Sequence, residues 1–173
     1  MKNARYLSIA AAVLILDQLS KYAILHGPVV ERAVPIIPGF FRLTYGENRG
    51  ALFGLFSDLA EPWRTLVLLI VPLLAIGLVL FFMRTSSGTD RLSLVALSLI
   101  LGGALGNQID RLFRSGRVVD FLDVYAGHEP LRGWLERTFG SAHWPAFNVA
   151  DSAIVTGALL MGWDLLRQLR RPR

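Results

Sequence analysis

The chain has 173 residues, of which 53% are hydrophobic and 18% charged, with a mean hydropathy of +0.47. This composition is too apolar for an ordinary soluble domain and excludes the collagenous, disordered and disulfide-scaffold classes. The formal net charge of +5 comes from basic residues that lie mainly at the ends of apolar blocks, so it does not indicate a nucleic-acid partner. We therefore expect a membrane protein.

Four apolar stretches have the length of about 20 residues that a transmembrane helix needs. They cover residues 7–25, 65–83, 92–112 and 147–166. No small-x-small cleavage site follows the first stretch, so we expect it to remain as an uncleaved span. We expect residues 1–173 to form a single integral membrane domain.

Basic residues predict the orientation of these spans, because Lys and Arg in short flanking segments are retained on the cytoplasmic side. They are concentrated at both termini and in the short connection at residues 84–91. Both termini are therefore predicted to be cytoplasmic. The longer loops at residues 26–64 and 113–146 are predicted to lie on the outer face.

The first outer loop carries β-prone runs at residues 29–30, 34–37 and 40–45, separated by turn residues. We expect a small sheet on the membrane surface. Residues 50–56 are apolar enough to dip into the interface, and residues 57–63 have the composition of a short helix or turn. The fold class is thus membrane α-helical, with four transmembrane helices and a small extracytoplasmic β-rich cradle.

Ionisable groups within a span are costly, so each is either a functional group or half of a structural pair. Asp17 and Lys21 are four residues apart and share one helix face, which favours a structural ion pair and leaves open a role in contacting substrate or lipid. Asp164 lies among the cytoplasmic arginines, where we expect a solvated boundary charge.

The third span ends in polar residues after a run of small ones at residues 102–106, which allows close helix approach. Asn107, Asp110, Arg111 and Arg114 follow at spacings of three and four. These spacings let their side chains form hydrogen bonds along and across helix faces. Taken alone, they are also consistent with a purely structural polar cap.

Two further carboxylates, Asp120 and Asp151, are predicted to meet at the outer boundary. Asp120 ends the run Gly116-Arg117-Val118-Val119, and burial in such an apolar segment raises the pKa of a carboxyl. Asp151 follows Asn148 by three residues at the start of the fourth span, where it can also serve in a helix cap. Two close carboxylates can share one proton and act as general base and general acid.

Other chemistries have weaker support in the sequence. The three histidines lie in the outer loops without ligand spacing, so neither a metal nor another cofactor is predicted. Cysteine is absent, which excludes thiol catalysis. Ser152 has no nearby Lys or His in the sequence to act as its base.

Five motifs, in this order, resemble those of the bacterial lipoprotein signal peptidase family, signal peptidase II. They are Asp17-Gln18-x-x-Lys21, Asn48-x-Gly50-Ala51-x-Phe53, Gly106-Asn107-x-x-Asp110-Arg111, Val118-Val119-Asp120-Phe121 and Phe147-Asn148-x-Ala150-Asp151-Ser152. The resemblance covers about residues 7–165. Leu52 departs from it, where many members have a second small residue, and residues 127–144 form a longer segment than usual.

This resemblance implies an aspartic endopeptidase of the bacterial inner membrane that has its active site at the outer face. Such an enzyme removes the signal peptide of a prolipoprotein immediately before its diacylglyceryl-modified cysteine, and globomycin-type inhibitors are expected to bind it. The catalytic pair falls on Asp120 and Asp151. Supporting residues fall on Asp17, Lys21, Asn48, Gly50, Asn107, Asp110, Arg111, Asn148 and Ala150.

Two alternatives from other classes remain at this point. Intramembrane carboxylates also serve as proton relays in small coupled transporters. However, these acids gather at one face, and the spans show no inverted repeat. A noncatalytic membrane scaffold, in which polar residues only cap and pair helices, is the other alternative.

Overall fold

The computed structural model describes residues 4–50, 59–60, 62–86 and 90–170. Within this part of the chain, four helices are long and apolar enough to cross a membrane. They are α1 (Leu7–Leu25), α2 (Trp63–Thr85), α3 (Arg91–Phe113) and α5 (Val149–Leu169). The predicted spans are confirmed, with bounds that differ by a few residues. The expected interfacial segment at residues 50–56 lies mostly outside the described residues.

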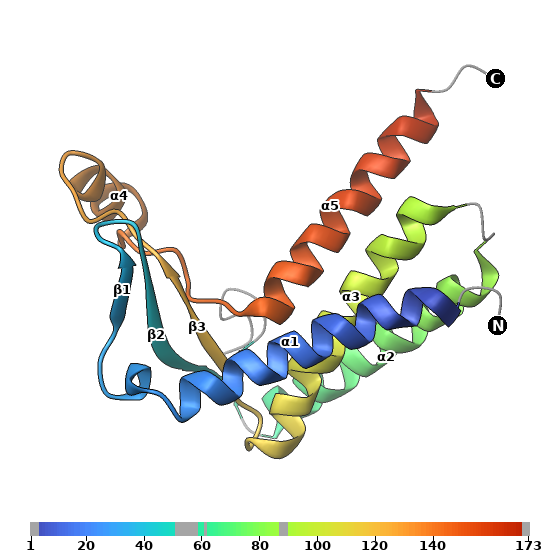
Figure 1. The fold of residues 1–173 in the computed structure, drawn as a ribbon, viewed down its shortest axis with the longest axis horizontal. Helices are drawn as coiled ribbons and strands as arrows, with labels where there is room; N and C mark the ends of the chain where they lie inside the picture. Colours follow the sequence, from blue (N-terminus) through green and yellow to red (C-terminus); the bar gives the residue numbers. More distant parts are fainter. Residues whose placement is uncertain (1–3, 51–58, 61, 87–89, 171–173) are drawn as a thin grey trace.

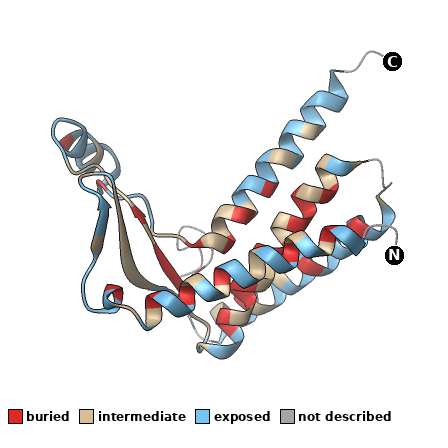
Figure 2. Cartoon of the chain, in the orientation of Figure 1, coloured by how far each residue is buried: buried red, intermediate tan, exposed pale blue. Residues whose placement is uncertain are grey.

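Helix α3 is the centre of the bundle and packs against each of the other three long helices. Its small residues permit this approach. A Cβ atom on Gly102 would lie 2.6 Å from the carbonyl oxygen of Ala10 on α1, and one on Gly103 would collide with the carbonyl of Ala150 on α5. Buried positions are concentrated on α3, whereas α2 and α5 are mostly exposed along their length (Figure 2). Exposed apolar side chains on spanning helices are what lipid contact requires.

The sheet has three antiparallel strands in the order β1 (Val34–Ile37), β2 (Phe41–Asn48) and β3 (Val118–Val124). It extends from the end of the bundle at a steep angle to α5 (Figure 1). The predicted β-prone runs at residues 34–37 and 40–45 are thus confirmed. The run at residues 29–30 instead belongs to a short 3-10 helix, η2 (Pro28–Val30), in which Pro28 occupies the first position. Proline at the start of a helical turn loses no hydrogen bond.

Strand β3 brings the two long loops together, because it pairs with β2 from the first loop while belonging to the second. The segment before α5 also runs along β3: the Phe147 carbonyl accepts hydrogen bonds from the amides of Phe121 and Leu122. Residue 147 therefore lies outside the helix that was predicted to begin there. The second loop also contains a helix that the sequence analysis did not predict, α4 (Leu131–Phe139), at the far end of the sheet (Figure 1).

Candidate active site

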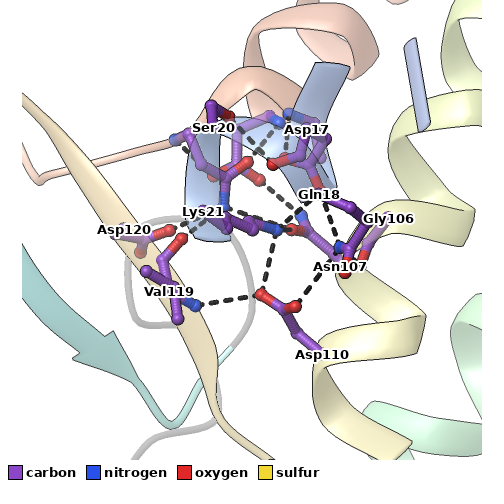
Figure 3. A network of polar contacts seen from close by, with 12 residues as sticks. Asp17, Gln18, Ser20, Lys21, Gly106, Asn107, Asp110, Val119 and Asp120 are labelled. Carbon is purple, nitrogen blue, oxygen red and sulfur yellow. Dashed lines mark hydrogen bonds and ion pairs between the residues drawn. The ribbon is translucent and has the colours of Figure 1, made fainter. Parts of the chain in front are cut away.

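Lys21 is the centre of a buried polar network that joins α1, α3 and β3 (Figure 3). Its side chain is fully buried, and Nζ lies 2.8 Å from a carboxylate oxygen of Asp17 and 3.0 Å from one of Asp110. Nζ also donates to Oδ1 of Asn107 at 3.0 Å. An ammonium group has three donors, so all of them are used. The predicted pair of Asp17 and Lys21 is present, and α3 contributes a second acid.

Asp110 connects this network to the strand that carries Asp120. One oxygen of Asp110 accepts from the backbone amide of Val119 at 3.1 Å. The other accepts from Arg114 at 3.1 Å and from Gln18 at 3.3 Å. A buried carboxylate is stable only when its lone pairs are satisfied. Asp110 therefore fixes the start of β3 against the end of α3.

Asp17 fixes the start of α5 in a similar way. Its Oδ1 accepts from the backbone amide of Ala150 at 3.0 Å. This contact needs close approach of the helices: a Cβ on Gly106 would lie 2.5 Å from Oδ2 of Asp17. The first turn of α5, which carries Asp151, is thus positioned by a charged group from α1.

Two asparagine side chains connect Asp120 and Asp151. The side-chain amide of Asn148 donates to Asp120 at 2.8 Å and to the side-chain oxygen of Asn107 at 3.1 Å. Asn107 in turn donates from its amide nitrogen to Asp151 at 2.8 Å. Both asparagines are at least nine-tenths buried. The two carboxylates are therefore oriented by one continuous set of hydrogen bonds.

The start of α5 also has the predicted cap. Asn148 accepts from the amide of Asp151 at 2.9 Å, and the Asp151 carboxylate accepts from the amide of Asn148 at 3.3 Å. This reciprocal arrangement is a capping box. The same Asn148 side chain thus caps the helix through its oxygen and contacts Asp120 through its nitrogen.

Asp120 has the titration behaviour that a shared-proton pair requires. It is 4% exposed, and burial, followed by the nearby charge of Asp151, raises its pKa from 3.8 to about 7. Hydrogen bonds from Asn48 and Asn148 oppose this increase. Desolvation and a like charge both disfavour the ionised carboxylate. Asp120 therefore takes up and releases a proton near neutral pH.

The remaining predicted residues lie next to the pair of carboxylates, Asp120 and Asp151. Asn48, at the end of β2, bonds to Asp120 and accepts from the amide of Gly50 at 2.8 Å. The Arg111 guanidinium donates to the carbonyl of Gly50 at 3.0 Å and is attracted by Asp120 and Asp151. The structure thus brings together the residues that the family resemblance assigned to the catalytic pair and to its support. Ala51, Leu52 and Phe53 lie outside the described residues.

A second polar cluster, which the sequence motifs did not predict, lies farther along β3. Asp123 is 4% exposed, pairs with Arg42 on β2 at 2.6 Å, and contacts Nδ1 of His143 at 2.9 Å. The His143 ring stacks on Tyr125 with centroids 5.2 Å apart. Asp123 follows Asp120 by three residues, so alternation along a strand places it on the opposite face. Its spacing was a usable signal, but its partners come from distant segments.

Asp164 differs from the expectation of a merely solvated charge. Its carboxylate accepts from Ser93 on α3 at 2.9 Å and from Gln168 at 2.8 Å. Ser93 lies near the start of α3, so this contact joins α3 and α5 at the end of the bundle away from the sheet. Asp164 is therefore a helix-joining group, distant from the network around Lys21.

Solved structures place this architecture in the class of integral membrane enzymes. One similar structure is a bacterial membrane enzyme determined by the in meso method at 2.3 Å resolution, with a TM-score of 0.79 and 28% identity. The match covers 98% of this chain and 92% of that chain. A second bacterial membrane enzyme, determined at 1.9 Å, gives a TM-score of 0.75 and 29% identity over 94% of this chain and 93% of that chain.

The family model for signal peptidase (SPase) II matches residues 9–167. A lipoprotein signal peptidase from Burkholderia ambifaria is 44% identical over 98% of this chain and 92% of its own length. One from Syntrophus aciditrophicus is 38% identical over 94% of this chain and 92% of its own length. The chain belongs to the signal peptidase II family. This membership disfavours both the transporter and the scaffold.

Proposed function

We propose that the chain is an aspartic endopeptidase that cleaves the signal peptide from diacylglyceryl-modified prolipoproteins, immediately before the modified cysteine. Asp120 and Asp151 are its catalytic pair. The observation that carries this proposal is the asparagine bridge, in which Asn148 contacts Asp120 and Asn107 contacts Asp151 at 2.8 Å each. Family membership supports the substrate class.

In this mechanism the ionised member of the pair removes a proton from water, and the water oxygen attacks the scissile carbonyl carbon. The protonated member donates its proton to the carbonyl oxygen, so the tetrahedral intermediate carries no net oxyanion charge. Collapse of the intermediate breaks the C–N bond as a proton passes to the leaving nitrogen. The products are the signal peptide with a new carboxyl end and the lipoprotein with an amino-terminal cysteine.

The buried network around Lys21 supports this chemistry by positioning the two acids. Asp110 holds β3 through the amide of Val119, and Asp17 holds α5 through the amide of Ala150. We assign Asp17, Lys21, Asn107, Asp110 and Asn148 to this positioning role. Asn48, Gly50 and Arg111 form the neighbouring edge, where substrate contact is expected.

The first test is cleavage of a diacylglyceryl-modified prolipoprotein by purified protein in detergent. Asp120→Asn and Asp151→Asn are each expected to abolish cleavage while thermal melts show that they remain folded. Asp164→Asn is the matched control, because it makes the same substitution in α5 outside the network. Ser152→Ala is expected to retain cleavage, which excludes a serine nucleophile. Parental rates in either dyad variant would refute the mechanism.

We further propose that the protein resides in the bacterial inner membrane with both termini cytoplasmic and the sheet at the outer face. The distribution of Lys and Arg supports this orientation. Because the chain has no cysteine, single cysteines introduced at Glu129 and Arg170 can be labelled in whole cells with a membrane-impermeant thiol reagent. Labelling at Glu129 alone is expected, and the reverse pattern would invert the topology. Globomycin-type inhibitors are expected to block cleavage.

A further inference from the structure

A small basic cavity lies where the end of β2 meets the start of α2 and the end of α3. Its volume is about 200 Å³, and four arginines line it: Arg49, Arg64, Arg111 and Arg117. Guanidinium groups present several N–H donors in a planar fork that matches the oxygens of phosphate. Arginines that meet around one cavity from four separate positions in the chain therefore point to an anionic ligand.

Arg111 supplies an independent indication of a missing partner. It is 9% exposed, and one terminal nitrogen donates to the carbonyl of Gly50 at 3.0 Å. Its Nε is buried and has no hydrogen-bond partner among the residues that the structure describes. Buried donors in proteins are nearly always paired, so an orphan donor needs an explanation. An acceptor within the cavity that Arg111 lines would satisfy it.

Among the described residues that line this cavity, four are arginines and none is acidic. Glu47 pairs with Arg117 at 2.5 Å, and both side chains are more than one-third exposed. On its other side Arg111 is attracted by Asp110, Asp120 and Asp151. Arg49 and Arg64 add two more positive charges to the lining. The cavity therefore favours a ligand with negative charge.

The ends of the spanning helices at this cavity imply that it lies at the level of the lipid headgroups. Arg64 and Thr65 belong to the first turn of α2, which starts at Trp63, and residues 115–117 follow the end of α3 at Phe113. Figure 1 shows these two helix ends together at the base of the sheet. Leu68 and Leu69 line the side of the cavity that leads along α2 toward the bilayer interior. Spans end where hydrocarbon gives way to the phosphate layer.

We propose that this cavity is a binding site for a phosphate group, presented by an anionic phospholipid at the bilayer surface or as free phosphate. The phosphate oxygens accept from the guanidinium groups and from Nε of Arg111. A helix start contributes partial positive charge at the same place, since α2 begins there. This site goes beyond the proposed peptidase reaction, and it shares with the proposed substrate-contacting edge only Arg111.

The test uses the full-length protein, purified and delipidated in detergent. Binding of phosphatidylglycerol, of diacylglycerol with the same acyl chains, and of inorganic phosphate is followed by native mass spectrometry and by the shift of the thermal melt. We expect phosphatidylglycerol to bind and stabilise the protein, and diacylglycerol to do neither. Competition by inorganic phosphate identifies the free anion as a ligand, whereas its failure to compete assigns the site to the lipid.

Arg49→Gln and Arg64→Gln test whether the cavity is the place of binding. Each is expected to weaken phosphatidylglycerol binding at least about tenfold, as loss of a charge-assisted hydrogen bond implies. Arg64→Lys keeps the charge without the planar fork and is expected to bind with intermediate strength. Arg132→Gln and Arg137→Gln on α4 are the matched controls, because they remove the same charge from exposed positions outside the cavity.

Three results would overturn the proposal. Phosphatidylglycerol and diacylglycerol could bind equally well, which would show that the phosphate contributes nothing. The α4 controls could weaken binding as much as the cavity variants, which would show that only net charge matters. Folded Arg49→Gln protein could bind like the wild type. The lipid comparison needs no substitution, so it decides the question even if Arg64→Gln fails to fold.

Discussion

Replacing Asp120 by Asn is expected to change how the stability of the protein depends on pH. Burial and the charge of Asp151 raise the pKa of Asp120 from 3.8 to about 7. Between these two values the folded protein retains a proton that the unfolded chain releases, so wild-type stability falls as pH rises. Each pKa unit corresponds to about 1.4 kcal/mol, so the full loss above pH 7 is about 4 kcal/mol.

Asn cannot ionise, and its side-chain oxygen can still accept from Asn148, which contacts Asp120 at 2.8 Å. Asp120→Asn is therefore expected to match the wild type near pH 4 and to exceed its free energy of unfolding by up to about 4 kcal/mol at pH 8. Reversible denaturation in detergent micelles from pH 4 to pH 8 measures this difference. The gain should grow steadily across the interval and then level off.

Glu136→Gln is the control for this experiment, because Glu136 lies in an exposed pair with Arg132. It is expected to leave the pH dependence unchanged. Asp151→Asn should reduce the slope in part, since it removes the second cause of the raised pKa of Asp120. Parallel stability curves for wild type and Asp120→Asn would refute the reasoning, because they would mean that the pKa of Asp120 is not raised by folding.

Three further predictions concern the network and the pair. Lys21→Met leaves Asp17 and Asp110 buried without their cation, so it is expected to lower the free energy of unfolding by about 3–5 kcal/mol in chemical denaturation. Arg132→Met, in an exposed pair, is the control and is expected to lower it by at most about 1 kcal/mol. Gly106→Ala places a Cβ 2.5 Å from Asp17 and should cost about 1–3 kcal/mol. Gly77→Ala on α2, where no described residue lies within 4 Å of the new Cβ, should change stability by less than about 1 kcal/mol, and equal effects of the two alanines would contradict the packing of α3. Initial cleavage rates should fall as pH rises through about 7, because Asp120 then loses the shared proton, and a rate that keeps rising to pH 9 would argue against it.

Local patterns in the sequence were sufficient for the spans and for two local features of the site. An apolar run of about 20 residues forms a helix in lipid, because a helix pairs all of its backbone N–H and C=O groups internally. The helices α1, α2, α3 and α5 could therefore be predicted. The spacing of Asp17 and Lys21 predicted their pair, and the spacing of Asn148 and Asp151 predicted the cap. These features are local, and their geometry follows from one turn of a helix.

Features that depend on contacts between distant segments could not be predicted in the same way. Helix α4 is short and lies in a loop with little apolar periodicity. The cluster of Asp123, Arg42 and His143 draws on two strands and on the segment before α5. The cavity lined by four arginines is likewise assembled from the end of β2, the start of α2 and the end of α3. Spacing along the chain does not predict contacts between segments that are distant in the sequence.

The membrane class and the four spans follow from the sequence alone, because hydrophobic length is a property of short segments. The full set of site residues followed from the resemblance of five motifs to a known family. The contacts of Lys21 with Asp110 as well as Asp17, and the bridge from Asp120 to Asp151 through Asn148 and Asn107, depend on the folded arrangement. A buried charge is tolerated only with complete partners, and those partners are supplied by helices and strands that the packing of α3 brings together.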